Sequence, residues 1–148
     1  MGLFDLKGKT AFVPGGYGGI GAAISAGLAR AGAKVVIAGR DGKKAAALAR
    51  RIGRGAKGVA LNVEDVAAIR RTVDAIGRLD MLVNCVGIQR EQALDEVTEE
   101  AFDLVYRTNL KAAMFLAQAC ARRQKRGGKQ VHLLSVRAQL GLRGRGYS

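Results

Sequence analysis

A glycine-rich segment follows a short apolar run near the start of the chain and has the sequence Gly15-Gly16-Tyr17-Gly18-Gly19-Ile20-Gly21. Glycine lets the backbone turn sharply and approach a phosphate without a Cβ in the way. Because an amphipathic stretch follows, the N–H groups and the positive dipole end of a helix would face an anion there. The spacing predicts a site for the diphosphate of a dinucleotide, lined by Gly15, Tyr17, Gly19, Ile20 and Gly21.

The next apolar run ends in Arg40, nineteen residues after Gly21, where a residue that recognises the adenosine ribose is expected. A carboxylate at this place would bind the free ribose hydroxyls, whereas a guanidinium suits a 2′-phosphate. Arg40 is therefore the candidate residue for recognising that ribose. The alternative interpretation is a solvated cation at the start of a helix.

The glycines fit two registers, GxGxxG from Gly16 to Gly21 and GxxxGxG from Gly15 to Gly21. With the second register, the chain resembles the short-chain dehydrogenase/reductase family over essentially its whole length. The resemblance also rests on three downstream features: Leu82-Val83-Asn84-Cys85-Val86-Gly87-Ile88, then Asn109-Leu110-Lys111, then a strand that ends in Ser135. It implies an NAD(P)-dependent oxidoreductase that transfers hydride between the nicotinamide and a carbonyl or alcohol of a small-molecule substrate.

The resemblance also implies roles for individual residues. Asn62 and Val63 would flank the adenine, and Asn84 and Gly87 would line the ribose side. Arg40 stands where the family places a basic residue for the 2′-phosphate, so the resemblance implies NADP in preference to NAD. Two residues would take part in catalysis: Ser135 would position the substrate oxygen, and Asn109 would anchor a proton-relay water. As alternatives, Ser135 caps a strand end and Asn109 bonds locally to the backbone.

Several family positions differ in this sequence. Pro14 replaces a Thr, Asn62 an Asp, Cys85-Val86 an Asn-Ala pair, and Ala138 a common Gly. The Tyr-x-x-x-Lys pair is absent. If Tyr147 is the family tyrosine, its lysine partner would be residue 151, after the last residue, Ser148; alternatively, the ending GYS resembles the run before the family tyrosine, and both residues would follow Ser148. We therefore expect a chain that is C-terminally truncated relative to the family. The alternative function is an inactive remnant that binds only nucleotide or a partner chain.

Two short matches resemble the gluconate 5-dehydrogenase branch of the family, namely 87–90 (GIQR) and 4–10 (FDLKGKT). This resemblance implies a sugar acid as substrate. A 3-oxoacyl thioester is the neighbouring option.

Short apolar runs alternate with amphipathic stretches, a pattern typical of strand-helix-strand units and a parallel sheet. It predicts strands at 10–14, 34–39, 58–63, 79–87 and 130–136, and helices at 20–31, 43–52, 64–76 and 98–123. The right-handed crossover rule gives an α/β fold of Rossmann type, a doubly wound parallel sheet with strand order 3-2-1-4-5. We expect one domain over 1–148, a flexible tail at 137–148, and a fifth strand whose bare edge invites strand-edge association or a homo-oligomer.

The 148 residues are 49% hydrophobic and 25% charged, as in globular proteins, with a formal net charge of +13. Eight cations lie late in the chain, but no aromatic interleaving accompanies them, so we interpret them as a solvated helix end and do not expect nucleic acid as a partner. No apolar run is long enough for a membrane span. Cys85 and Cys120 lack metal-site spacing and predict reduced, buried thiols in a cytoplasmic protein without a metal.

Overall fold

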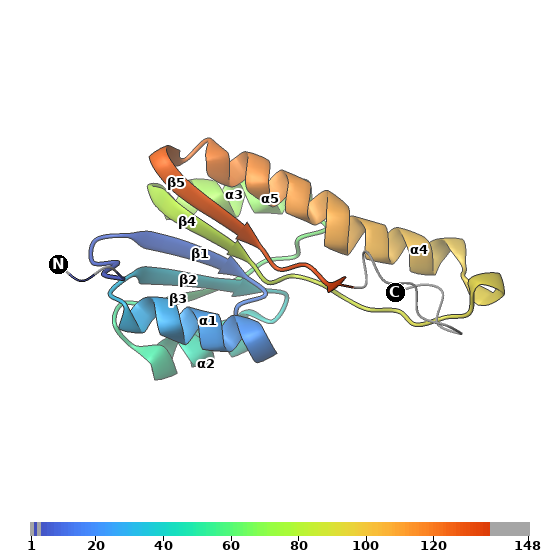
Figure 1. Ribbon diagram of the computed structural model, residues 1–148, viewed down its shortest axis with the longest axis horizontal. Helices are drawn as coiled ribbons and strands as arrows, with labels where there is room; N and C mark the ends of the chain where they lie inside the picture. The colour runs from blue at the N-terminus through green and yellow to red at the C-terminus, as the bar shows by residue number, and fades with distance from the viewer. Residues whose placement is uncertain (1, 3, 137–148) are drawn as a thin grey trace.

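The computed structural model describes residue 2 and residues 4–136. A five-stranded parallel sheet with the order β3-β2-β1-β4-β5 forms its centre (Figure 1). The elements follow one another as β1 (Thr10–Pro14), α1 (Gly19–Arg30), β2 (Lys34–Gly39), α2 (Gly42–Ile52), β3 (Lys57–Ala60), α3 (Val66–Ile76), β4 (Leu79–Asn84), the 3₁₀ turn η1 (Leu94–Glu96), α4 (Glu99–Val105), the π-helical turn η2 (Tyr106–Lys111), α5 (Ala112–Ala121) and β5 (Gln124–His132). The predicted fold class and strand order are confirmed.

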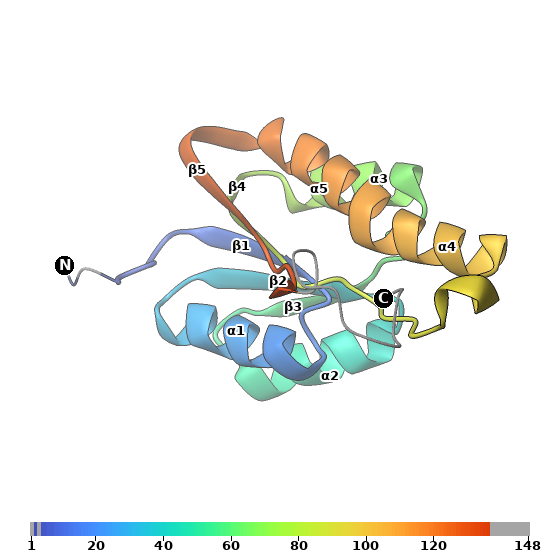
Figure 2. The ribbon, with the colours of Figure 1, turned by 45° about the vertical axis from the view of Figure 1, so that its right-hand side comes forward.

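Helices cover both faces of the sheet. Figure 2 shows α1 and α2 on one side and α3, α4 and α5 on the other. The central strand β1 alternates between the two sides, because Phe12 packs with Leu82 and Leu116 in one core cluster while Ala11 and Val13 belong to the other. All three β1 residues are fully buried. This packing fixes the strand that carries the glycine-rich turn.

The predicted boundaries match the first two strands and differ from the structure in β3, β4, β5 and the last predicted helix. β1 and β2 have the predicted bounds, whereas β3 ends at Ala60 and β4 at Asn84, each three residues early. The helix predicted at 98–123 ends at Ala121, six residues before Gly127, so the Gly127-Gly128 pair does not terminate it.

The fifth strand begins at Gln124 rather than at residue 130 and ends at His132 rather than at residue 136. A bulge explains the difference, since the pairing with β4 shifts between Leu79–Gln124 and Met81–Lys129. Gly127, with φ +90°, permits this irregular backbone. The predicted tail at 137–148, with Ala138 and Tyr147, lies outside the described residues.

A partly buried carboxylate joins the first strand to the fourth. Asp80 Oδ2 accepts the Thr10 N–H at 2.9 Å, while its other oxygen lies 3.4 Å from Arg78 and 3.8 Å from Lys9. Burial alone would raise the pKa of Asp80, but the Thr10 hydrogen bond and the two cations together lower it. The charged form of Asp80 therefore stabilises the folded chain.

We expect Asp80→Asn to reduce the free energy of unfolding by about 1 kcal/mol at pH 7. Because the folded pKa is lowered, this contribution is complete above the usual carboxyl pKa of about 3.9 and disappears as the pH falls through the folded value. Urea unfolding between pH 7 and pH 2.5 measures the difference in the free energy of unfolding between the original chain and the Asp80→Asn variant. A difference that stays constant at acidic pH would show that the charge of Asp80 is unimportant.

Candidate nucleotide-binding site

Main-chain hydrogen bonds continue past the carboxyl ends of the strands and hold the following loops side by side. They run from Leu61 N to Gly39 O, from Gly15 N to Ala38 O, from Cys85 N to Pro14 O and from Leu133 N to Asn84 O, at 2.8 to 3.0 Å. The loops after β1 and β4 meet at the point where the helices switch faces of the sheet. Open α/β sheets bind their ligands at such a switch point.

Two predicted glycines pack the turn between β1 and α1 against its surroundings. Gly15 has φ +71°, and a Cβ there would lie 2.6 Å from the carbonyl oxygen of Cys85. A Cβ at Gly21 would collide with the carbonyl oxygen of Gly15. These two glycines therefore let the turn close against the loop after β4 and against the start of α1.

Gly18 and Gly19 differ, because a Cβ at either would have no neighbour within 4 Å. Gly18 is the N-cap of α1 and supplies no side-chain hydrogen bond to the helix. The first-turn N–H groups lack intrahelical partners for geometric reasons, and Ile20 beside them is 69% exposed. This open, uncapped helix start suits a phosphate.

Two residues that the sequence analysis missed support the turn. The buried hydroxyl of Ser25 donates to the carbonyl oxygen of Gly16 at 3.0 Å. Gly39, at the end of β2, leaves room for the ring of Tyr17, which a Cβ would strike. In the sequence, only the small size of Ser25 and Gly39 indicates that these residues support the turn.

Tyr17 thus lies over the end of β2, beside the predicted ribose-recognition residue. Its hydroxyl accepts the Asp41 N–H at 3.3 Å. Arg40 is exposed and has no hydrogen bond or ion pair with the residues that the structure describes. Asp41, the nearest carboxylate, accepts the Lys44 N–H at 3.0 Å as the N-cap of α2. The guanidinium remains available to an outside anion, whereas the carboxylate serves the helix.

The predicted adenine residues follow β3. Val63 is buried, and Asn62 is exposed. Asn62 Oδ1 accepts the Glu64 N–H at 3.1 Å. An amide oxygen has two lone pairs, so one stays open to a donor on a ligand, and the side-chain NH₂ group can donate to an acceptor on a ligand.

Asn84, predicted to line the ribose side, is only 4% exposed. Its Oδ1 accepts the Val86 N–H at 3.1 Å, and its Nδ2 lies 3.4 Å from Nδ1 of His132. The side chain therefore shapes the loop after β4 and ties β4 to β5. Gly87 in that loop is exposed.

Asn109 lies in the π-helical turn η2, which interrupts the predicted continuous helix, and π turns frequently mark functional sites. Its side chain accepts the Ile88 N–H and donates to the Ile88 carbonyl oxygen, each at 2.9 Å. The bonds to backbone are thus not local, because they join segments 21 residues apart. They hold the Gly87 loop against η2.

Ser135 is exposed and lies three residues after the end of β5, not at its last residue. The structure therefore brings together the loops that carry Gly15, Cys85, Gly87 and Asn109. It places Ser135 on the segment after the neighbouring strand.

Both cysteines are free, as predicted, with Cys85 half-buried and Cys120 buried. Burial raises the pKa of both thiols, that of Cys120 to about 12. They stay protonated at neutral pH and are poor nucleophiles. Over residues 4–136, no group of His, Cys, Asp or Glu side chains has the arrangement of a metal site. Nor does that part of the chain hold a helix with the length and apolar character that crossing a membrane requires.

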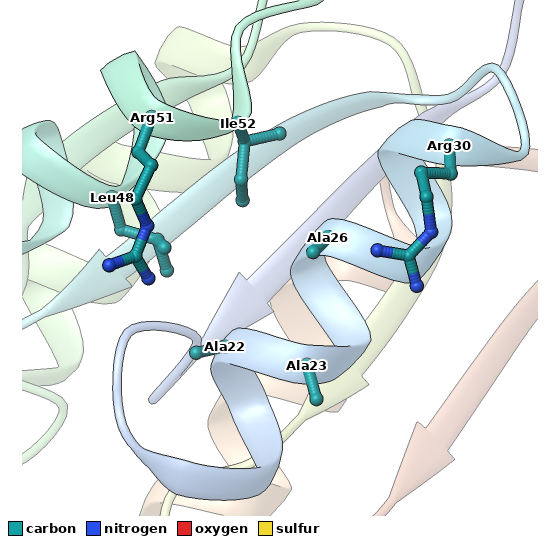
Figure 3. Close-up of a pocket in the computed structure, with 7 residues that line it drawn as sticks. All are labelled: Ala22, Ala23, Ala26, Arg30, Leu48, Arg51 and Ile52. Atoms are coloured by element: carbon teal, nitrogen blue, oxygen red, sulfur yellow. The ribbon is translucent and has the colours of Figure 1, made fainter.

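A shallow groove of about 400 Å³ separates α1 from α2, away from the loops described above. Figure 3 shows Ala22 and Ala26 between the side chains of Arg30 and Arg51. Leu48, Ile52 and Ala23 complete the lining. The lining lacks a carboxylate, imidazole, thiol or hydroxyl group, so the groove offers no acid–base or nucleophilic chemistry.

Comparison with known proteins gives consistent results. The family model described as short chain dehydrogenase matches residues 9–147. A gluconate 5-dehydrogenase of Gluconobacter oxydans is 38% identical over an alignment of 152 positions, which covers 93% of this chain and 57% of the relative. A 3-oxoacyl-[acyl-carrier-protein] reductase of Vibrio harveyi is 35% identical over 143 residues, 93% of this chain and 59% of the relative.

Solved structures show the same likeness. A dehydrogenase/reductase of Sinorhizobium meliloti 1021 superposes with a TM-score of 0.88 and 35% identity, covering 98% of this chain and 60% of that protein. The chain thus spans less than two thirds of the length of the relatives it matches.

Proposed function

The chain belongs to the short-chain dehydrogenase family, and we propose that it carries the nucleotide-binding half of an NAD(P)-dependent oxidoreductase. The observation that carries the proposal is the contrast among the glycines of one turn. Gly15 and Gly21 are packed against backbone, whereas Gly18 and Gly19 face open space at an uncapped helix start. This arrangement leaves backbone N–H groups for a diphosphate.

In the proposed reaction the bound nicotinamide supplies or accepts a hydride at a carbonyl or alcohol carbon. The chain's own residues would bind and orient the reactants. The Ser135 hydroxyl holds the substrate oxygen, and Asn109 keeps the Gly87 loop in place and positions a water for proton transfer. Asn62 and Val63 lie at the adenine, and Asn84 and Gly87 at the ribose side.

The substrate class follows from the relatives, one a gluconate 5-dehydrogenase and one a 3-oxoacyl thioester reductase. We expect a sugar acid first and a 3-oxoacyl thioester second. Mixing the chain with NADPH and panels of keto-sugar acids and 3-oxoacyl thioesters, while following absorbance at 340 nm, tests the proposal. Cofactor binding without substrate-dependent oxidation would instead favour the alternative function, a remnant that binds nucleotide or a partner chain without turnover.

For cofactor choice we propose NADP, because Arg40 is exposed and free to meet a 2′-phosphate while Asp41 caps α2. Arg40→Ala should raise the Kd for NADPH about 10- to 100-fold, because hydrogen bonds to a charged group usually contribute that much to affinity. The Kd for NADH should be unchanged. Isothermal titration calorimetry with both cofactors measures this, with Lys43→Ala as a control that also removes one cation. Equal losses for NADPH and NADH would remove the case for NADP.

A homo-oligomer is part of the proposal and rests on an apolar stripe over α4, η2 and α5. Phe102, Tyr106, Leu110 and Met114 recur every four residues, are 49% to 59% exposed, and so share one helix face. The rings of Phe102 and Tyr106 stack with centroids 6.2 Å apart. The outer edge of β5 is a second candidate for association, since β5 is the last strand in the sheet.

We propose a cytoplasmic location.

A further inference from the structure

Every strand of the parallel sheet begins next to a cation. Lys34 and Lys57 are the first residues of β2 and β3, Lys9 and Arg78 directly precede β1 and β4, and Lys125 is the second residue of β5. Because the strands are parallel, their first residues lie together at one end of the sheet, on the left in Figure 1. We call the surface at this end, where the strands begin, the amino-terminal edge. This amino-terminal edge is opposite to the predicted nucleotide site.

The helices add further cations to the same edge, since each returns antiparallel to the strands and ends there. The exposed cations of the edge and of the chain beside it are Lys7, Lys9, Arg30, Lys34, Arg50, Arg51, Arg54, Lys57, Arg78, Arg122, Arg123, Lys125, Arg126 and Lys129. Asp5, Asp74 and Asp80 are the only carboxylates in the same segments. The other carboxylates lie at the starts of α2 and α3 and between residues 91 and 103.

The edge is therefore strongly positive even after local neutralisation. Asp80 pairs with Lys9 and Arg78, and Asp74 with Arg123. The carboxyl ends of four helices contribute about half a negative charge each, roughly two charges in all. Most of the formal net charge of +13 thus gathers on one edge of a small domain.

The sequence pattern alone favours a solvated helix end for the late cations and does not predict a nucleic-acid partner, but the fold gathers cations from every strand start onto one surface. We propose that this amino-terminal edge binds the phosphate backbone of double-stranded nucleic acid without reading its base sequence. Neighbouring strands lie about 4.8 Å apart, so the five strand starts extend over roughly 19 Å with cations along their length. A duplex carries one negative charge per about 1.7 Å of axis, so several phosphates can meet this edge together. Strand starts and helix ends form the edge, and no helix projects from it to enter a groove.

One observation favours a duplex over a single strand or a membrane surface. Among the residues that the structure describes, Phe4 is the only exposed large aromatic or aliphatic side chain near the edge, where the hydrogen bond from Leu6 N to Ala31 O places its segment. Binding of single strands relies on several stacking aromatics, and anchoring in a membrane relies on several inserted apolar groups. An edge of cations with a single phenylalanine matches backbone contacts better.

The test is fluorescence anisotropy of a labelled 24-base-pair duplex with the full chain between 50 and 200 mM salt. With about six phosphate contacts, the affinity should fall about 1,000-fold over this range. The triple variant Lys125→Gln, Arg126→Gln, Lys129→Gln should make the slope of log affinity against log salt shallower by about 2.7, or about 0.9 for each contact. A matched triple, Lys43→Gln, Lys44→Gln, Arg90→Gln, removes the same charge elsewhere and should leave the slope unchanged.

Saturating NADPH should not displace the duplex, because the two sites lie at opposite ends of the strands. Equal changes in slope for both triple variants would overturn the proposal by showing dependence on total charge alone. Displacement by NADPH would assign the binding to the nucleotide site instead. Tighter binding to phosphatidylserine vesicles or to a single strand than to the duplex, at the same salt, would also contradict it.

Discussion

Gly15→Ala is expected to lower the free energy of unfolding by about 2 to 5 kcal/mol, the sum of left-handed strain and overpacking. Gly15 has φ +71°, and the new Cβ would lie 2.6 Å from the carbonyl oxygen of Cys85 and 2.9 Å from Val86 N. Both neighbours are backbone atoms of a loop fixed by the hydrogen bond from Cys85 N to Pro14 O. The turn can therefore not yield without parting β1 from β4.

Urea unfolding measures this loss, and Gly18→Ala is the matched control in the same turn. Gly18 has φ −102° and no neighbour within 4 Å of a Cβ, so its substitution should cost less than about 1 kcal/mol. A methyl group at Gly18 would instead enter the space proposed for the diphosphate and weaken NADPH binding in a stable protein. Similar stability losses for the two variants would contradict the division of the glycines into packed and open positions.

The order of strands and helices could be predicted because its signals are local. Apolar runs mark β1 and β2 to the residue, and Thr98 caps α4 by accepting the Ala101 N–H at 3.2 Å, as its side chain predicts. The crossover rule then leaves few topologies, and the observed order is among them. Each of these inferences needs only neighbouring residues or a general rule of chirality.

The bulge in β5 could not be predicted, because it depends on pairing with a strand some 45 residues earlier. Glycines at 127 and 128 fit a helix stop and a strand bulge equally well in sequence. Contact with β4 decides between them, since Gln124 pairs with Leu79 and Lys129 with Met81. Because of the bulge, β5 begins at Gln124, six residues before the predicted start at residue 130.

The candidate site was predictable in its residue types and less so in their partners. The sequence identifies the glycine turn, but it does not separate Gly15, packed on the Cys85 carbonyl, from Gly18, which is open. It marks Asn84 without revealing that Val86 and His132 engage both ends of the amide. Likewise, the cations of the amino-terminal edge are scattered along the chain and become one surface only through the topology.

Asn109 provides the second large effect, because its side chain is the connection between η2 and the loop after β4. Asn109→Ala would leave the N–H and the carbonyl of the half-buried Ile88 without their partners. Each group left without a partner costs about 1 to 3 kcal/mol, so for the two groups we expect a loss of about 2 to 6 kcal/mol in the free energy of unfolding. Lys111→Ala, at an exposed side chain in the same π turn and outside the apolar stripe, should cost less than about 1 kcal/mol.

Amide hydrogen exchange distinguishes this role from a general weakening of the helix. In Asn109→Ala the Ile88 amide should exchange faster by more than the global loss of stability explains, since its acceptor is gone. The amides of β1 and β2 should change only with global stability, because their ladder does not involve Asn109. If Ile88 exchanges in step with those strands, the loop is held by other contacts, and the position of Gly87 at the proposed ribose side does not depend on Asn109.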